Sequence, residues 1–164
     1  MWEPNGSHTY AADRDAIIEL CRTVEMASFN VPEGERIFGI GSEDELIGFL
    51  KELGPELVLL RCGARGLYTI HDGEVWFIPS VAVPEGSAVV DTTGCGNTST
   101  AGACVAWCEG KGPVMTGIMA NISSSYNLRQ KGPYPHIGET EMREAADLAQ
   151  RLFSEKKFSR YGGR

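Results

Sequence analysis

Hydrophobic residues recur three and four positions apart in several stretches of the chain, which is the spacing of an amphipathic helix. The first stretch covers residues 13–27, with Asp13 at the position of an N-cap. After a loop at 28–35, broken by a proline and a glycine, Ser42-Glu43-Asp44-Glu45 has the form of a capping box and predicts a second helix that stops at Gly54-Pro55. Three more stretches are predicted to be helical: an alanine-rich one ending near Cys108, 114–128 and 139–153.

Short apolar runs lie between these helices and predict strands. Leu57-Val58-Leu59-Leu60 has the continuous apolar character expected of a strand buried on both faces. The pair Asp72-Gly73 separates the runs 67–70 and 75–78, which predicts a hairpin. A further short strand is expected at 87–90. Short strands that alternate with longer helices predict an α/β layered fold with a mainly parallel sheet.

The length of 164 residues fits one domain, and 42% apolar with 23% charged residues is an ordinary globular composition. Disordered, collagen-like and coiled-coil classes are therefore excluded. We expect the domain to occupy residues 1–155. The remaining residues, 156–164, are polar and rich in glycine, and we expect this tail to fray.

The chain is acidic, with 15 Lys and Arg against 22 Asp and Glu and a net charge of −7. This balance argues against a nucleic-acid partner, but helix N-termini can still bind a small anion through backbone amides. No stretch approaches the roughly 20 apolar residues of a membrane span. The cysteines form an odd set without a C-x-x-C pair, so a reducing, cytoplasmic location is expected. They are Cys21, Cys62, Cys95, Cys104 and Cys108.

The segment from Asp91 to Gly102 holds the most informative chemistry. It is expected to contain a strand end, then Asp91-Thr92-Thr93-Gly94-Cys95-Gly96-Asn97, then a helix. Two glycines at such a turn let the backbone approach a ligand, and the helix dipole favours a phosphate there. Asp91 could hold a cation or a hydroxyl. The alternative is a tight structural turn in which Asn97 is an ordinary N-cap, and the residues alone leave both open.

The turn at 91–97 resembles the Asp-Thr-x-Gly-Ala-Gly-Asp motif of the ribokinase-like (PfkB) carbohydrate kinases. Three other short motifs follow that family's order and extend the resemblance over nearly the whole chain. They are Asn30-Val31-Pro32-Glu33, Gly63-Ala64-Arg65-Gly66, and Ala120-Asn121 with Lys131-Gly132-Pro133. The resemblance implies a three-layer α/β/α fold with a β-hairpin and a kinase that transfers phosphate from ATP to a hydroxymethyl group of a sugar or nucleoside.

The same resemblance implies roles for individual residues. Gly94 and Gly96, with the amides of Cys95 and Asn97, would form an anion hole for the transferred phosphoryl group. Asn30 and Glu33 would organise the water ligands of Mg²⁺, and Asp91 and Thr93 would contribute to a site for a monovalent cation such as K⁺. The residues implied for nucleotide binding are Gly63, Arg65, Gly66, Ala120, Asn121 and Gly132.

One departure concerns catalysis. The last residue of the family's motif is an Asp that acts as the general base, and here Asn97 stands at that position. A carboxamide cannot accept a proton at neutral pH, and a positioned base contributes about 10²–10⁴-fold to rate. A second hypothesis is therefore a nucleotide-binding pseudokinase or regulatory module without phosphotransfer. A third is a structural half that only dimerises.

The other departure concerns length. The resemblance places Met1-Trp2-Glu3-Pro4 at the end of a strand in the middle of the family's domain, so the sugar-contacting part and the lid are missing. The chain is then either a fragment of a longer protein or a short protein that covers its exposed sheet edge as a homo-oligomer. The fragment is favoured because an unpaired sheet edge promotes aggregation.

Overall fold

The structure is a computed structural model that describes residues 1–4, 11–82, 88–132 and 137–162. Its helices are α1 (Arg14–Cys21), α2 (Val31–Phe38), α3 (Glu43–Leu50), α4 (Cys95–Cys108), α5 (Gly112–Asn127) and α6 (Glu139–Ser154). Its strands are β1 (Met26–Asn30), β2 (Leu57–Arg61), β3 (Gly66–His71), β4 (Glu74–Pro79) and β5 (Ser159–Arg160). Two short 3₁₀ turns, η1 (Ala11–Asp13) and η2 (Gly63–Arg65), precede α1 and β3.

The five strands form one sheet in the order β1-β2-β3-β4-β5. The pairing of β1 with β2 is parallel, and the other three pairings are antiparallel. The expectation of a mainly parallel sheet is therefore wrong for the described strands, because the hairpin β3–β4 and the terminal strand β5 supply the antiparallel pairs. On the outer side of β1, Trp2 makes a parallel bridge to Ala27.

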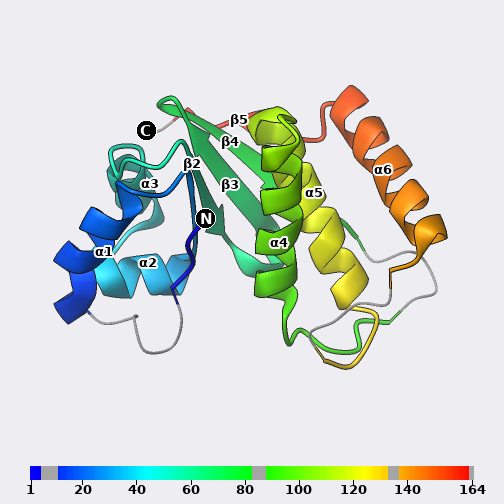
Figure 1. Ribbon diagram of the computed structural model, residues 1–164, viewed down its shortest axis with the longest axis horizontal. Helices are drawn as coiled ribbons and strands as arrows, with labels where there is room; N and C mark the ends of the chain where they lie inside the picture. The colour runs from blue at the N-terminus through cyan, green and yellow to red at the C-terminus, as the bar shows by residue number, and fades with distance from the viewer. Residues whose placement is uncertain (5–10, 83–87, 133–136, 163–164) are drawn as a thin grey trace.

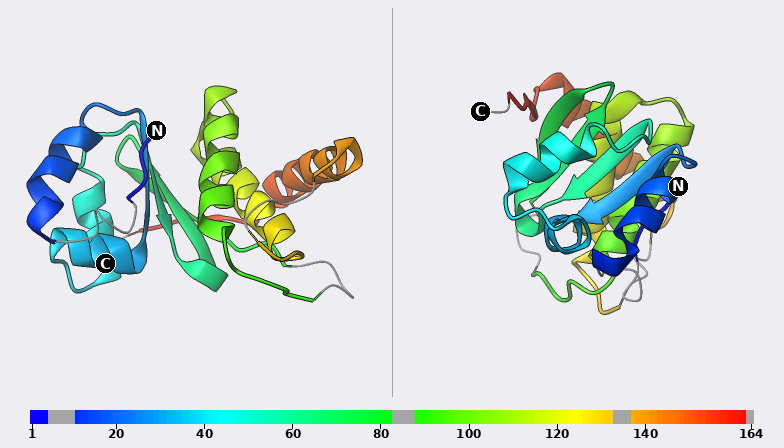
Figure 2. Two further views of the ribbon diagram at one scale, coloured as in Figure 1. Left: turned by 60° about the horizontal axis from the view of Figure 1, so that its bottom comes forward. Right: turned by 90° about the vertical axis from the view of Figure 1, so that its left-hand side faces the viewer.

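Helices cover both faces of the sheet, as Figures 1 and 2 show. α1, α2 and α3 pack on one face around a core that includes Phe29, Ile37 and Leu60. α4, α5 and α6 lie on the other face, where Leu59 and Ile118 belong to a second core. Because neighbouring residues of a strand point to opposite faces, Leu59 and Leu60 serve different cores. The predicted three-layer α/β/α fold is confirmed.

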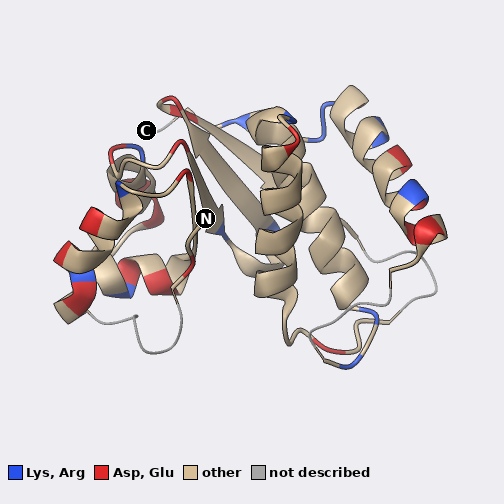
Figure 3. Ribbon diagram, viewed as in Figure 1, with Lys and Arg blue, Asp and Glu red and all other residues tan. Residues whose placement is uncertain are grey.

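Charge is distributed unevenly over these layers. Figure 3 shows acidic and basic residues gathered on α1, α2, α3 and α6. The sequences of α4 and α5 contain no charged residue at all. These two uncharged helices pack closely on one another, and they lie beside the carboxyl ends of β1 and β2, where the predicted motifs converge.

Several predicted elements are confirmed close to their expected bounds. β2 is buried along Leu57–Leu60, as its apolar run predicts. The hairpin forms around Asp72 and Gly73, both of which have positive φ, at 48° and 71°. α5 and α6 begin and end within two residues of the predicted helices. In these segments the local pattern and the tertiary packing favour the same structure.

The first predicted helix is too long and the following predicted loop is wrong. α1 ends at Cys21, and 26–30 forms the strand β1. The residues expected to break the chain after it instead begin α2, where Pro32 lies in the first turn. A proline is tolerated there because the first amides of a helix need no intrahelical acceptor.

The predicted end of α3 and the strand expected at 87–90 are both wrong in detail. Ser42 accepts a hydrogen bond from the amide of Glu45, as half of a capping box, and α3 ends at Leu50 rather than at Gly54-Pro55. The described residues 88–90 of the segment 87–90 form no strand, although the amide of Val90 donates to Leu128 O at 2.7 Å.

The tail expected to fray instead adds β5 to the edge of the sheet. In β5, Ser159 and Arg160 pair with β4, and the amide of Tyr161 donates to Val75 O at 2.8 Å.

Candidate functional site

A cavity of about 460 Å³ lies at the N-terminus of α4. Its walls come from the carboxyl ends of β1 and β2, from η2, from the segment after β4, from the loop before α4, and from α4 and α5. Six of the predicted site residues line it, so residues far apart in the sequence meet here. They are Asn30, Gly63, Gly66, Cys95, Gly96 and Asn121.

The turn into α4 is held by Gly94, which is the N-cap with a φ of 83°. Its carbonyl oxygen accepts two hydrogen bonds from Thr98, one from the amide and one from the hydroxyl, both at 2.9 Å. A positive φ of this kind favours glycine, because other residues have a Cβ that clashes there. The idea that Asn97 is the N-cap is therefore wrong: Asn97 is the third residue of the helix, and its side chain is exposed.

The amides of this turn differ in what they can offer an anion. The amide of Cys95 donates to Thr92 O at 3.2 Å, so it already closes the turn. The next amides, of Gly96 and Asn97, lie in the first helical turn, where no acceptor exists inside the helix. Of the expected anion hole, these two are the donors that the helix presents to a ligand.

Arg61, at the carboxyl end of β2, lies directly against Gly96. A Cβ at position 96 would come within 2.3 Å of Arg61 Nη1, closer than real carbon atoms approach. The space that a side chain at position 96 would fill is taken by the guanidinium, and the backbone of Gly96 does not itself demand glycine. Gly96 thus lets the arginine side chain pass close beneath the first turn of α4.

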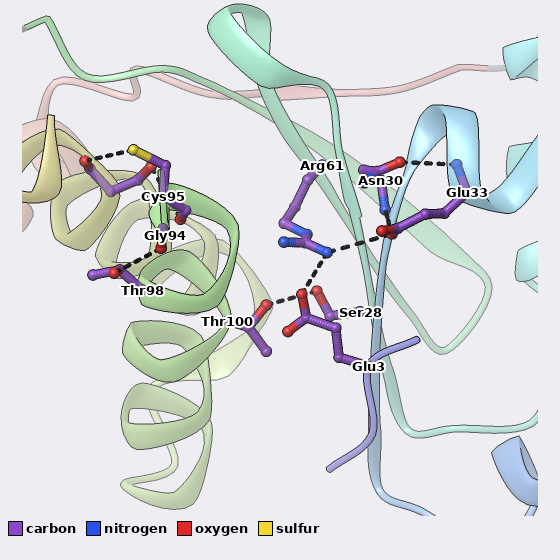
Figure 4. A network of polar contacts seen from close by, with 10 residues as sticks. Glu3, Ser28, Asn30, Glu33, Arg61, Gly94, Cys95, Thr98 and Thr100 are labelled. Carbon is purple, nitrogen blue, oxygen red and sulfur yellow. Dashed lines mark hydrogen bonds and ion pairs between the residues drawn. The ribbon is translucent and has the colours of Figure 1, made fainter. Parts of the chain in front are cut away.

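Two carboxylates hold the other end of the same guanidinium, as Figure 4 shows. Arg61 Nη2 lies 2.8 Å from Glu3 Oε1 and 3.6 Å from Glu33 Oε2. The side chain of Arg61 is only 11% exposed, and the two glutamates are about one fifth exposed. Limited exposure to water weakens screening, so these charges interact more strongly than surface pairs.

The predicted pair Asn30 and Glu33 forms a complete capping box at the start of α2. The amide of Glu33 donates to Asn30 Oδ1 at 2.8 Å, and the amide of Asn30 donates to Glu33 Oε2 at 2.9 Å. Glu33 Oε2 therefore accepts from a backbone amide and also faces Arg61. Within the described ranges, no group of three or more His, Cys, Asp or Glu could hold a metal ion. A Mg²⁺ at this carboxylate would take its remaining ligands from phosphate and water, as it commonly does.

Asp91 organises a second cluster, which lies beside the cavity and does not line it. Its carboxylate accepts from the amide of Thr93 at 2.9 Å and from the amide of Gly132 at 3.1 Å. These backbone donors lower the pKa of Asp91 below its usual value, because they stabilise the ionised form. Asn127 Nδ2 donates to Thr93 O at 2.8 Å and ties the turn to α5.

Three predicted nucleotide contacts, Arg65, Ala120 and Gly132, do not line the cavity. Arg65 forms a double hydrogen bond with Glu43 on α3, and Tyr68 donates to the same carboxylate at 3.0 Å. The side-chain hydrogen bond with Arg65 lowers the pKa of Glu43, and the partial burial of that carboxyl opposes the shift. Ala120 is fully buried in the core between the sheet and α4–α6.

Asn121 is positioned by the backbone at the end of β4. Its Nδ2 donates to Ile78 O and to Pro79 O, both at 3.0 Å, while the residue lines the cavity. The side chain therefore fixes α5 against the sheet at the wall of the site. Of the Lys131-Gly132-Pro133 motif, Pro133 lies outside the described residues.

The sequence interpretation missed Arg61. The sequence did contain a signal for it: a charged residue directly follows the apolar run Leu57–Leu60 and precedes the glycine motif that begins at Gly63. Its partners could not be found from sequence, since Glu3 and Glu33 come from distant segments. In the part of the chain that the structure describes, no helix has the length and apolar character of a membrane span.

Comparison with solved structures finds the same fold in proteins described as sugar or nucleoside kinases. A probable sugar kinase from Rhizobium etli matches with a TM-score of 0.74 at 19% identity, over 84% of this chain and 41% of that one. An adenosine kinase from Sinorhizobium meliloti matches with a TM-score of 0.72 at 22% identity, over 80% and 40%. A putative ribokinase II from E. coli, solved with ATP and Mg²⁺, matches with a TM-score of 0.67 at 20% identity, over 84% and 43%.

Comparison of sequences gives the family. A ribokinase from Arabidopsis thaliana is 31% identical over 124 residues, which cover 73% of this chain and 32% of that protein. The chain thus spans about a third of this curated relative and less than half of the solved structures above. The family model of the pfkB carbohydrate kinases matches residues 3–139. With most of its length matched, this chain belongs to the pfkB family of carbohydrate kinases.

Proposed function

We propose that this chain supplies the nucleotide-binding half of a kinase that transfers the γ-phosphoryl group of ATP to a hydroxymethyl group of a sugar or nucleoside. The observation that carries the proposal is the cavity at the N-terminus of α4, where six residues from the family's motifs meet. Family membership supports the reaction class. The shape and lining of the cavity support a bound nucleotide, because it combines backbone donors, small residues and one cation.

In this proposal the first turn of α4 binds the phosphates. The amides of Gly96 and Asn97 donate to phosphoryl oxygens, and the helix dipole adds to their effect. Gly63 and Gly66 allow the nucleotide to lie close to η2, and Asn121 fixes the opposite wall. Mg²⁺, when bound, neutralises phosphate charge and aligns the transferred group. Glu33, already oriented by Asn30, would hold its water ligands.

The transfer forms a bond between the acceptor oxygen and phosphorus and breaks the bond from phosphorus to the oxygen that bridges the β- and γ-phosphates. The acceptor hydroxyl must also lose a proton. Asn97 cannot take it, so in this proposal the proton passes to an oxygen of the transferred phosphoryl group, in a transfer that depends mainly on positioning and charge stabilisation. Asn97 is exposed at the mouth of the turn, where it can donate or accept a hydrogen bond with the acceptor. The pseudokinase hypothesis rests on this one residue.

Calorimetric titration of the 164-residue chain with ATP and Mg²⁺ tests the binding part of the proposal. We expect saturable binding that Gly94→Val and Gly96→Val each weaken strongly, because both side chains intrude into the phosphate-binding turn. A matched control is Gly48→Val on α3, where a Cβ meets nothing within 4 Å. Unchanged affinity in both turn variants would refute the anion hole.

A phosphotransfer assay on the full-length protein tests the catalytic part, with Asn97→Asp alongside. Turnover by the unmodified protein supports the kinase and eliminates the pseudokinase. Binding without turnover, together with activity gained in Asn97→Asp, would support the pseudokinase instead. A folded protein that binds no ATP would leave only the structural, dimerising role.

A further inference from the structure

We propose that Arg61 is a built-in cation of the phosphate site, which shields bound phosphate from Glu3 and Glu33 and allows the chain to bind a nucleotide without a divalent ion. The inference deepens the proposed function and rests on it. Of the described residues that line the cavity, Arg61 alone carries a charge.

The two terminal nitrogen atoms of the guanidinium contact different parts of the site. Nη2 is directed to Glu3 and Glu33, at 2.8 Å and 3.6 Å. Nη1 lies against Gly96 in the first turn of α4. The arginine therefore separates two carboxylates from the turn that presents amides to an anion. Glycine at position 96 is what makes this placement sterically feasible.

Electrostatics explains why the separation matters. Two partly buried carboxylates close to a phosphate would repel it, and the repulsion is stronger where access of water is limited. The Arg61 side chain is 11% exposed, so its charge is also little screened. A divalent ion relieves the same repulsion when it is present. Without one, the shielding depends on Arg61, and affinity should depend on Arg61 most strongly when metal is absent.

The test titrates ADP into the 164-residue chain in excess Mg²⁺ and again in EDTA. For the unmodified chain we expect affinity in EDTA within about tenfold of that in Mg²⁺. For Arg61→Met we expect a loss of about ten- to a hundredfold in EDTA, which is the range for a hydrogen bond to a charged group, and a much smaller loss in Mg²⁺. Arg61→Lys, which keeps the charge, should retain most of the metal-free affinity.

The matched control is Arg160→Met. Arg160 also pairs with a glutamate, Glu74, but on the strand β5 at the far edge of the sheet. We expect its affinities to be unchanged in both buffers. Arg61→Met leaves Glu3 and Glu33 without their shared cation and could unfold the chain, so the double variant Arg61→Met with Glu3→Gln is measured as well. It should show a smaller loss that is still selective for EDTA, because Glu3→Gln removes one of the two repelling charges and Glu33 remains.

The outcomes separate this inference from the proposed function. Absence of ADP binding even in Mg²⁺ overturns the proposed function and the inference with it. Binding in Mg²⁺ that disappears in EDTA for the unmodified chain overturns the inference alone. So does an equal loss in both buffers for the Arg61 variants, because a merely structural role would weaken binding regardless of metal.

Discussion

At the scale of single residues, the site depends on the contact between Gly96 and Arg61. The two residues come from different elements, α4 and β2, and each fits the other: the missing side chain of Gly96 makes room for Nη1. Glu3 and Glu33 then fix the guanidinium from the opposite side. The guanidinium of Arg61 thus lies next to the N-terminus of α4, a helix that has no charged side chain.

Gly96→Ala should destabilise the protein by about 1–3 kcal/mol, the usual cost of overpacking, because the new Cβ collides with Arg61. Denaturant unfolding measures the change. Gly48→Ala on α3 is the control, and it should be neutral or slightly stabilising, because a Cβ there meets nothing within 4 Å and alanine favours helix. If the collision is the cause, Gly96→Ala costs less stability in an Arg61→Ser background than in the unmodified chain. Equal stability of the two alanine variants would contradict this account.

Asp91 should titrate below the ordinary range of an aspartate. Backbone donors from Thr93 and Gly132 stabilise its carboxylate in the folded state, so the folded pKa is lower than the unfolded one. The stabilising effect is therefore present above the unfolded pKa of about 3.9 and is lost as the pH falls through the folded pKa. NMR titration of the side-chain carboxyl measures this directly. A midpoint at the ordinary value of an aspartate, about 3.9, would contradict these backbone contacts.

At the scale of elements, α4 is fixed to the sheet by a buried polar contact. Ser28 Oγ on β1 and Thr100 Oγ1 on α4 lie 2.9 Å apart, and both residues are nearly inaccessible to water. The contact joins the strand that ends in Asn30 to the helix that begins after Gly94. It helps set the distance between the two halves of the cavity wall.

Removing one partner of this contact should cost about 1–3 kcal/mol, because the remaining hydroxyl is left buried without its hydrogen bond. Ser28→Ala and Thr100→Val are the single variants, measured by denaturant unfolding. The double variant leaves no hydroxyl unsatisfied and should cost less than the sum of the two. Strict additivity would show that the two side chains do not interact in solution.

The same elements show how far the sequence could predict the fold. β2, the hairpin, α5 and α6 follow from local pattern, since their apolar spacing or turn residues agree with their packing. β1 was missed because its polar Ser28 is buried through a partner on α4, far along the chain. α2 was missed because Pro32 and Gly34 suggested a loop, whereas Asn30 caps the helix and Gly34 lies against Leu46.

For the site, the motifs could be located but their contacts could not. The glycine turn was placed correctly, while its cap proved to be Gly94 rather than Asn97. Arg65 was expected at the nucleotide because it stands in a glycine motif, but Glu43 on α3 holds it. Arg61 has partners from two distant segments, and only the folded chain brings them together.

At the scale of the whole molecule, one sheet has a hydrophobic core on each face, and the cavity is lined by residues of the sheet and of the segments packed on it. The face with α4, α5 and α6 presents the uncharged helices α4 and α5 (Figures 1 and 3). Asn30, the N-cap of α2 on the other face, also lines the cavity. The chain matches less than half of the length of each solved structure above.

The most direct test of the central claim is an NMR titration of the isotopically labelled chain with ATP and Mg²⁺, read at the backbone amides. The account predicts that the largest shifts fall on Gly96 and Asn97 in the first turn of α4, with further shifts at Gly63, Gly66 and Asn121. Amides of β5, at the far edge of the sheet, should not move. Shifts confined to other surfaces, or no saturable shift at Gly96 and Asn97, would contradict the claim that this turn binds the phosphates.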